Sequence, residues 1–259
     1  MGPLPMEAPV PGSSFSDLLT ATGNSPAFSI PEGSQMPVIP EGTTVLALRY
    51  QGGVVMAGDR TATEGNLVAH RTIRKVFPAD RYSAVAIAGV AGLAMDMVKL
   101  FQVELEHYEK LEGVRLSLEG KASFLARLVK SQLGMALRGL VVVPLFAGFD
   151  AKEGQGKVYS FDVVGGRYLE SDFGSTGSGS RLAKAYLRTQ YEPDVTADEA
   201  LALAVKGLVS AAREDTATGG PDLERGIYPN LIRIDADGLV EIPDTDIAPI
   251  AEDAVETVR

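Results

Sequence analysis

Polar and apolar residues alternate with a period of two from residue 43 onward, which predicts a β-strand. One face would carry Thr44, Leu46, Leu48 and Tyr50, and the other Thr43, Val45, Ala47 and Arg49. The sequence Gln51-Gly52-Gly53 is typical of a turn, and residues 54–58 return as a second strand. The two strands therefore form a predicted hairpin.

Apolar residues at steps of three and four predict a helix that Gly113 ends. Its apolar positions are Leu93, Met97, Leu100, Phe101, Leu105, Tyr108 and Leu111. A second helix is predicted over about 117–133 and a third from about Ser178 to Tyr191. A fourth opens at Thr196, because Glu199 three residues later completes a capping-box spacing.

Further strands are predicted over 83–89, 140–149, 157–163 and 167–170, with a last hairpin over 231–234 and 239–242. Strands and helices thus alternate in pairs. This order favours an α+β fold of two antiparallel sheets packed face to face with helices outside, a four-layer αββα sandwich. We expect this domain to span 43–243 and residues 244–259 to form an acidic, solvated tail.

The first 42 residues hold eight of the 15 prolines and no Lys or Arg. So many prolines oppose helix and sheet, which predicts a mobile leader; docking of its apolar stretch 15–19 on the folded body is the alternative. The lack of basic residues removes the n-region of a secretory signal, and no apolar run reaches the ~18 residues of a membrane span. We therefore expect a cytoplasmic protein.

The net charge of −10 argues against a nucleic-acid partner, which requires clustered Lys and Arg. Without Cys, the chain has no disulfide, no thiol nucleophile and no Cys-based metal site. His70 and His107 are the only candidates for an imidazole triad, and His107 is expected on a charged, solvated helix face.

The Gly42-Thr43 junction lies where the leader meets the first predicted strand. If the chain is cut there, Thr43 carries both a hydroxyl nucleophile and an α-amino base, the pair used in threonine-type nucleophilic catalysis. An ordinary α-amino group has a pKa of about 7.7 to 8.0, so a small downward shift prepares it as a base near neutral pH.

Three more residues are expected near Thr43. Asp59 ends the second strand of the hairpin, and Lys75, if buried, would need a carboxylate partner such as Asp59. A Lys ammonium there would favour a neutral amine and a developing alkoxide. Gly89 ends a buried strand, and its N–H is a candidate oxyanion donor. Taken singly, the charged residues fit a surface ion pair and Gly89 an ordinary strand end.

Two other clusters carry hydroxyl groups. Residues 176–180, Thr-Gly-Ser-Gly-Ser, resemble a phosphate loop, but they lack the P-loop Lys and the G-x-G-x-x-G spacing, which argues against nucleotide binding. Residues 214–220 follow a predicted helix and include Asp215 and Thr218.

Together these motifs resemble those of bacterial-type β subunits of the proteasome core particle, over essentially all of residues 43–259. The matching segments are Thr43-Thr44-Val45, Gly58-Asp59-Arg60 with Ala62-Thr63, Lys75-Val76, Ile87-Ala88-Gly89, residues 176–180, and Asp215 followed by Thr218-Gly219-Gly220. Two positions depart from the family pattern. Thr218 stands where many relatives have Ser, and Thr61 stands where many have a second Arg.

The resemblance implies an N-terminal-nucleophile hydrolase fold, in which residues 1–42 are a propeptide removed by self-cleavage after Gly42. It implies that Thr43 is nucleophile and base, that Asp59 and Lys75 support it, and that the Gly89 N–H serves the oxyanion hole. The implied network near the Thr43 amine consists of Ser178, Asp215 and Thr218. No metal or organic cofactor is implied.

Peptide substrates in this family lie as an added strand between the segments that match Thr61 to Thr63 and Gly89 to Ala91. By the same resemblance, Ala62 and Ile87 would line the pocket beside the scissile bond. An apolar floor predicts cleavage after apolar or aromatic residues. The expected activity is that of a threonine endopeptidase acting on unfolded proteins.

The resemblance also implies a closed barrel of stacked, seven-membered rings, in which β rings face α rings built from a different subunit. A ring-shaped AAA+ ATPase unfoldase would act through the α ring on proteins tagged with a ubiquitin-like modifier. The leader would keep the Thr43 amine acylated until the rings close.

Three alternatives stay open. The simpler two-ring bacterial relative has a similar Thr-Thr start, but it is usually shorter and lacks the Thr-Gly-Gly after the late Asp. A small-molecule amidohydrolase with an N-terminal nucleophile would mostly use Cys or Ser. A structural ring subunit would lack Thr43, Asp59 or Lys75, and all three are present here.

Overall fold

The structure, a computed structural model, describes residues 42–64 and 67–258. These residues belong to one compact unit, Val38–Arg259. The predicted leader, with its apolar stretch 15–19, lies outside the described residues except for Gly42. Among the helices of the described ranges, none is both long enough and apolar enough to cross a membrane.

The first sheet contains five antiparallel strands in the order β10-β1-β2-β11-β12. Its strands are β1 (Thr44–Tyr50), β2 (Gly53–Gly58), β10 (Phe173–Gly177), β11 (Asn230–Asp235) and β12 (Gly238–Glu241). The predicted β1–β2 hairpin is confirmed, and Val45 pairs with Gly58 at its open end. This register brings the residues that follow β2 beside the residues that precede β1.

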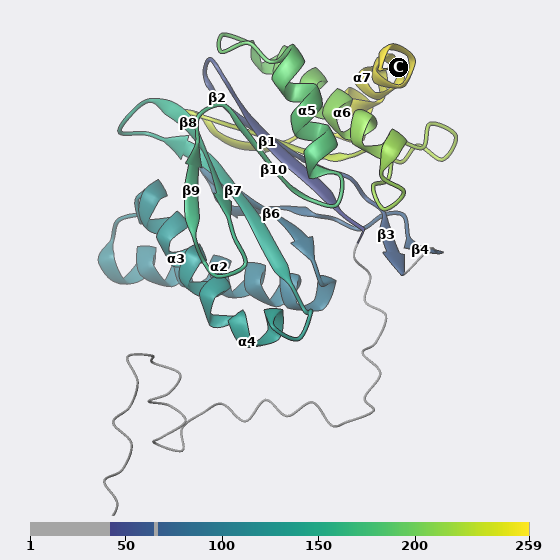
Figure 1. The fold of residues 1–259 in the computed structure, drawn as a ribbon. Helices are drawn as coiled ribbons and strands as arrows, with labels where there is room; N and C mark the ends of the chain where they lie inside the picture. The colour runs from purple at the N-terminus through teal and green to yellow at the C-terminus, as the bar shows by residue number, and fades with distance from the viewer. Residues whose placement is uncertain (1–41, 65–66, 259) are drawn as a thin grey trace, which may run out of the picture. The chain divides into compact units, whose positions relative to one another are not determined.

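The second sheet also contains five antiparallel strands, in chain order β5-β6-β7-β8-β9. Its strands are β5 (Val76–Asp80), β6 (Ser83–Gly89), β7 (Val142–Asp150), β8 (Gln155–Phe161) and β9 (Arg167–Glu170). A small hairpin of β3 (Ala62–Glu64) and β4 (Leu67–His70) connects the sheets in sequence and projects from the body (Figure 1).

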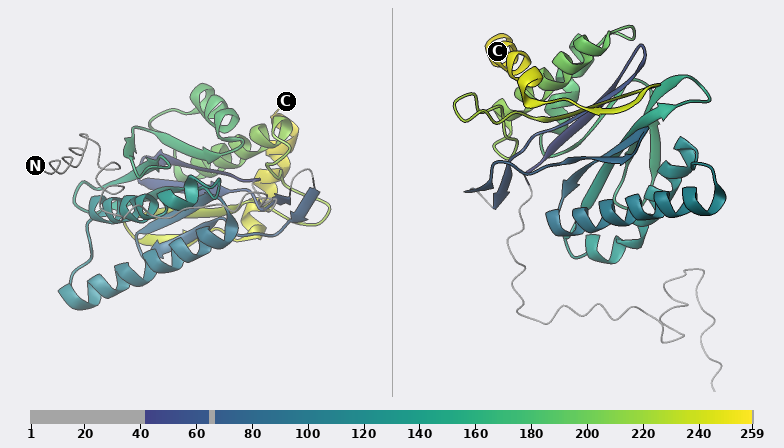
Figure 2. Two further views of the ribbon diagram at one scale, coloured as in Figure 1. Left: turned by 60° about the horizontal axis from the view of Figure 1, so that its bottom comes forward. Right: turned by 180° about the vertical axis from the view of Figure 1, so that it is seen from behind.

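Helices cover the outer face of each sheet, as two views from other sides also show (Figure 2). Beside the second sheet lie α2 (Ala91–Glu112), α3 (Leu118–Ser131) and the short α4 (Leu133–Ala136). Beside the first sheet lie α5 (Ser180–Gln190), α6 (Ala197–Glu214) and α7 (Asp244–Thr257). The predicted four-layer αββα sandwich of two antiparallel sheets is confirmed.

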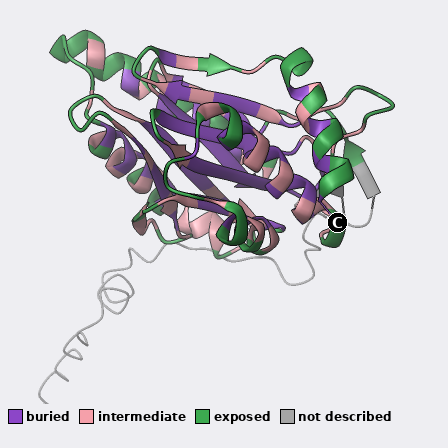
Figure 3. Ribbon diagram, turned by 90° about the horizontal axis from the view of Figure 1, so that it is seen from above, coloured by how far each residue is buried: buried purple, intermediate pink, exposed green. Residues whose placement is uncertain are grey.

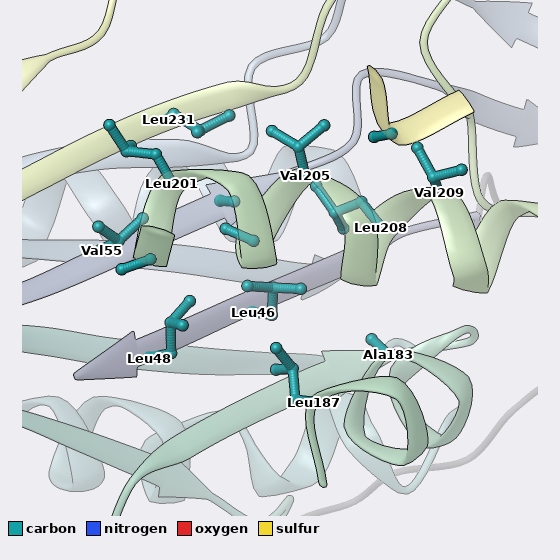
Figure 4. Packing of buried hydrophobic residues seen from close by; sticks show 14 of the residues in the cluster. Leu46, Leu48, Val55, Ala183, Leu187, Leu201, Val205, Leu208, Val209 and Leu231 are labelled. Atoms are coloured by element: carbon teal, nitrogen blue, oxygen red, sulfur yellow. The ribbon is translucent and has the colours of Figure 1, made fainter. Parts of the chain in front are cut away.

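The period-two pattern of β1 divides its side chains between two apolar layers. Val45 and Ala47 point into the layer between the sheets, where they meet residues of the second sheet such as Leu145. Leu46 and Leu48 point the other way, against α5 and α6 (Figure 4). Burial on both faces leaves the central strands β1, β2, β6 and β7 largely inaccessible, whereas the helices expose their outer sides (Figure 3). The site end of β1 is therefore packed on both faces.

The predicted helix ends agree with the structure at two caps. Gly113 adopts the left-handed conformation, with φ of 68°, and ends α2. Thr196 and Glu199 form the predicted capping box at the start of α6. Along α2, however, Leu100 and Leu111, two of the apolar positions that predicted the helix, are 47% and 71% exposed, so the apolar face is only partly buried.

The prediction that residues 244–259 form an acidic, solvated tail is wrong. Asp244–Thr257 form α7, which buries Ile247, Ala251 and Ala254 beside α6. The spacing of these three residues, four and then three, is that of one helix face. Pro249 lies in the second turn of α7 and does not prevent this packing.

Candidate active site

Thr43 lies directly before β1 and is 5% exposed. Its carbonyl oxygen accepts a hydrogen bond from the Ser178 backbone N–H at 2.9 Å, and the Ser178 hydroxyl oxygen lies 3.2 Å from it. Gly177 permits this approach: its φ is 101°, and a Cβ at this position would lie 2.0 Å from the Thr43 carbonyl oxygen. The end of β10 thus fixes the backbone of Thr43.

Asp59 follows β2 and is 1% exposed. Its Oδ1 accepts from the Thr44 N–H and from Lys75 Nζ, both at 2.7 Å. Its Oδ2 accepts from the N–H groups of Thr61 and Gly219, both at 3.0 Å. Four donors therefore surround a carboxylate that is fully removed from water, which compensates for the cost of burying its charge.

Lys75 immediately precedes β5, and its side chain is 5% exposed. Nζ donates to Asp59 Oδ1 at 2.7 Å, to the Thr61 carbonyl oxygen at 2.5 Å and to the Gly42 carbonyl oxygen at 3.0 Å. Burial lowers the pKa of Lys75 below its ordinary value, and the adjacent Asp59 carboxylate offsets part of this effect. The predicted pairing of Asp59 with Lys75 is confirmed, because the two side chains form an ion pair.

The Gly42 carbonyl oxygen receives two donors in the uncut chain. Thr43 Oγ donates to it at 2.6 Å, and Lys75 Nζ donates at 3.0 Å. Both donors draw electron density from the carbonyl group, because positive charge near the oxygen favours the negative charge that develops there on attack. The arrangement thus polarises the bond that the sequence singles out for cleavage.

A cluster of hydroxyl groups and one carboxylate is joined to Thr43 through Ser178, whose backbone N–H donates to the Thr43 carbonyl oxygen. Asp215 Oδ2 accepts from the Ser178 hydroxyl at 2.6 Å and from the Thr218 hydroxyl at 2.5 Å. Burial on its own would raise the pKa of Asp215, but these two hydrogen bonds hold it below its ordinary value. The three residues are therefore brought together as the resemblance implied, around an ionised carboxylate.

Gly89 ends β6 in the left-handed region, with φ of 118°. A Cβ there would lie 2.0 Å from the Val141 carbonyl oxygen, so glycine is required. Gly89 lines a pocket together with Gly42 and Thr43, which places it beside the junction.

The same pocket is lined mostly by apolar side chains. Of the residues predicted to bind substrate, Ala62, Ile87 and Ala91 line it. Thr61 contributes its backbone to the Asp59 and Lys75 hydrogen bonds, and the Thr63 side chain lies outside the described part of the structure.

Sequence reasoning missed the other apolar walls of this pocket, which are Ile73, Phe77, Ala94 and Met95. Two of them carried a usable signal. Phe77 follows Lys75 by two residues in an extended segment, which places both on one face. Met95 follows Ala91 by four residues at the start of α2, which again indicates one face.

Lys121 is a second buried lysine, and its partner is Asp80 instead of Asp59. Lys121 of α3 forms an ion pair with Asp80, and Ser83 donates to the same carboxylate at 2.6 Å. The side chains of Lys121 and Asp80 are 5% and 16% exposed. Burial alone would raise the pKa of Asp80, but Lys121 holds it below its ordinary value.

No group of His, Asp and Glu within the described ranges could hold a metal ion.

Comparison with known proteins places this geometry in context. A family model described as "Proteasome subunit" matches residues 39–222, which is more than half of the chain. A protein of Acidimicrobium ferrooxidans named "Proteasome subunit beta" is 50% identical over 249 residues, covering 96% of this chain and 91% of that protein. One of the same name from Streptomyces griseus is 48% identical over 262 residues, covering 98% and 92%.

Proposed function

The chain belongs to the proteasome subunit family and is a β subunit of a proteasome core, and we propose that it is a catalytic one, a threonine endopeptidase that frees its own nucleophile by cutting after Gly42. The observation that carries this proposal is the hydrogen bond from Lys75 Nζ, held by Asp59, to the carbonyl oxygen of Gly42. One of the three N–H donors of the Lys75 ammonium is thus placed on the oxygen of the peptide bond that would be cut.

Self-cleavage would follow from this geometry. Thr43 Oγ attacks the Gly42 carbonyl carbon, the carbon–nitrogen bond breaks, and the hydroxyl proton ends on the Thr43 nitrogen. The oxygen of the resulting ester is that of Thr43, and water then hydrolyses the ester to release residues 1–42. The products are a free α-amino group and a free hydroxyl on Thr43. The proposed domains are thus the propeptide and a protease domain that begins at Thr43.

Hydrolysis of a substrate would repeat the same chemistry between molecules. Thr43 Oγ attacks the substrate carbonyl, the Thr43 amine takes the hydroxyl proton and passes it to the leaving amine, and water then cleaves the acyl-enzyme ester. We assign Asp59 and Lys75 to support the nucleophile, the Gly89 N–H to the oxyanion, and Ser178, Asp215 and Thr218 to the surroundings of the amine. The neutral amine is favoured by the nearby Lys75 ammonium, because like charges repel.

The apolar pocket beside Thr43 supports cleavage after apolar or aromatic residues. A substrate side chain entering this pocket would meet mainly apolar residues such as Ala62, Ile87 and Met95, with Arg74 and Lys75 also on its lining. Backbone pairing beside Thr61 to Thr63 and Gly89 to Ala91 would hold the peptide as an added strand, which tolerates many sequences. The proposed substrates are unfolded proteins.

A β subunit assembles with α subunits in a core particle. We further propose stacked seven-membered rings in the cytoplasm, an AAA+ unfoldase that acts through the α ring, and substrates tagged with a ubiquitin-like modifier. Family membership supports these partners. The protease needs to be enclosed in a barrel, because an endopeptidase that accepts many sequences would otherwise degrade other proteins whenever they unfold.

Hydrolysis of short fluorogenic peptides by the assembled core tests the activity. Three peptides would carry an apolar, a basic or an acidic residue before the reporter group. We expect the apolar peptide to be cleaved fastest, Thr43→Ala to abolish cleavage, and Thr189→Ala, at an exposed threonine of α5, to leave it unchanged. Cleavage that survives in Thr43→Ala would refute the role of Thr43, and a preference for the basic or acidic peptide would refute the assigned specificity.

A further inference from the structure

The hydroxyl of Thr44, the residue after the proposed nucleophile, is completely buried and makes two hydrogen bonds. The Gly179 backbone N–H donates to Thr44 Oγ at 2.9 Å. Thr218 Oγ lies 2.5 Å from Thr44 Oγ. None of the motif reasoning assigned this hydroxyl a role, although it contacts the proposed network directly.

Proton counting fixes the direction of these bonds. Thr218 Oγ donates to Asp215 Oδ2 at 2.5 Å, and an ionised carboxylate can only accept. A hydroxyl has one proton, so Thr218 must accept from Thr44. Thr44 in turn accepts from the Gly179 N–H. The series of hydrogen bonds therefore runs in one direction, from the Gly179 N–H through Thr44 and Thr218 to Asp215.

Close packing around Gly179 restricts how the hydroxyls of Thr44 and Thr218 can be placed. A Cβ on Gly179 would lie 2.6 Å from the hydroxyl oxygens of both Thr44 and Thr218. Ser178, the residue before Gly179, holds the Thr43 carbonyl through its own N–H at 2.9 Å. Two consecutive residues thus hold Thr43 and Thr44 from one side, and the second of them starts the hydrogen-bond chain.

We propose that Thr44 is a positioning residue for the proposed reaction: its hydroxyl aims the Thr218 proton at Asp215 and so keeps this carboxylate oriented beside Thr43. The inference rests on the proposed protease function. Without the Thr44 proton, Thr218 loses its only donor within this chain and is free to rotate. Asp215 then loses one of its two fixed hydroxyl donors.

Substitution of Thr44 in the assembled core tests this role. Thr44→Val keeps the shape and removes the hydroxyl, and Thr44→Ser restores a hydroxyl. Ser175→Ala is the matched control, because Ser175 is a buried hydroxyl that donates to the Val45 carbonyl at 2.8 Å and does not join the chain to Asp215. The measurements are intact mass, to count processed subunits, and peptide hydrolysis by those subunits as a function of pH.

We expect Thr44→Val to lower kcat by about three- to tenfold with little change in KM, the worth of one oriented hydrogen bond. The acidic limb of its pH profile, which reports protonation of the Thr43 amine, should shift, because Asp215 no longer keeps its orientation beside that amine. Thr44→Ser should regain most of the activity and the parent pH profile. Ser175→Ala should lower thermal stability alone. A Thr44→Val core that keeps the parent kcat and pH profile would overturn the proposal.

A double-mutant comparison separates positioning from general loosening. If Thr44 acts through Thr218, Thr44→Val adds little to the loss already caused by Thr218→Val. Full additivity of the two losses would contradict the proposal, and Thr44→Ala serves in the same comparison if the valine variant does not assemble. A parent core that neither removes residues 1–42 nor cleaves peptides would instead refute the proposed function itself, and the inference with it.

Discussion

Lys75 Nζ lies 3.0 Å from the carbonyl oxygen of Gly42, the residue that precedes the proposed nucleophile. The lysine is buried and reaches this oxygen while bound to Asp59 at 2.7 Å. A buried cation beside the Gly42–Thr43 peptide bond gives this bond an environment that most backbone amides lack. The proposed self-cleavage depends on this contact, whereas the proposed peptide hydrolysis, which follows the release of residues 1–42, depends on Lys75 itself.

Replacing Lys75 distinguishes a role in cleavage from the general effect of losing a buried lysine. Lys75→Met should reduce self-cleavage and peptide hydrolysis by at least about 10²-fold, the range of a lost proton-transfer or charge-stabilising group. Lys121→Met removes a lysine of similar burial from a pair with Asp80, and it should lower stability but leave self-cleavage within about twofold. Intact mass against time after synthesis measures both. Equal effects of the two variants on cleavage would argue against a special role for Lys75.

The Lys121 and Asp80 pair predicts a defined pH dependence of stability. The pKa of Asp80 is lowered in the folded chain, so the pair contributes its full stability above the unfolded value of about 3.8 and loses it as the pH falls through the lower, folded value. At pH 7, Asp80→Asn should lower the free energy of unfolding by about 3 kcal/mol, because it leaves Lys121 buried without a partner.

Urea unfolding of the uncut Thr43→Ala chain, with and without Asp80→Asn, measures this difference. The difference should be constant from pH 7 to pH 5 and shrink below about 3.8. A difference that grows as the pH falls would mean that the pKa of Asp80 is raised on folding.

The pocket walls predict how peptide preference changes. Met95→Ala enlarges the apolar pocket beside Thr43. The ratio of kcat/KM for a peptide with Phe before the cut to that for one with Leu should rise by about tenfold, since a few methylene groups of fit are worth 1–3 kcal/mol. Leu100→Ala changes an exposed residue of the same helix and should leave the ratio unchanged. An unchanged ratio in Met95→Ala would remove Met95 from the specificity pocket.

The C-terminal helix should contribute to stability. Ile247 of α7 is 1% exposed, so Ile247→Ala should lower the free energy of unfolding by about 2 to 4 kcal/mol through lost burial and a cavity. Val255→Ala, at a residue 37% exposed, should cost less than about 0.5 kcal/mol. Urea unfolding of the uncut Thr43→Ala chain compares them. Equal, small losses would mean that α7 does not hold to the body.

The sequence was sufficient to predict the β1–β2 hairpin and the pairing of Asp59 with Lys75. Both follow from local information: the period of two sets the strand faces, and a buried lysine needs a carboxylate close by. The long-range contacts of Asp59 were not predictable in this way. Gly219 donates to Asp59 from 160 positions later, and only the packing of α6 against the first sheet brings it there.

The elements that were missed show where composition misleads. The acidic residues and Pro249 concealed α7, although Ile247, Ala251 and Ala254 already had helical spacing. No strand was predicted over residues 173–177, yet this segment is strand β10, where Gly174 and Gly177 make room for close neighbours. Conversely, Leu100 and Leu111 fitted an apolar face that the folded chain leaves exposed.

The most direct test of the account is the intact mass of this chain after co-expression with an α subunit. The parent should lose residues 1–42, so that Thr43 becomes the first residue, while Thr43→Ala assembled in the same way should keep them. Parent subunits that retain residues 1–42 in assembled particles would contradict the account and identify the chain as a structural subunit.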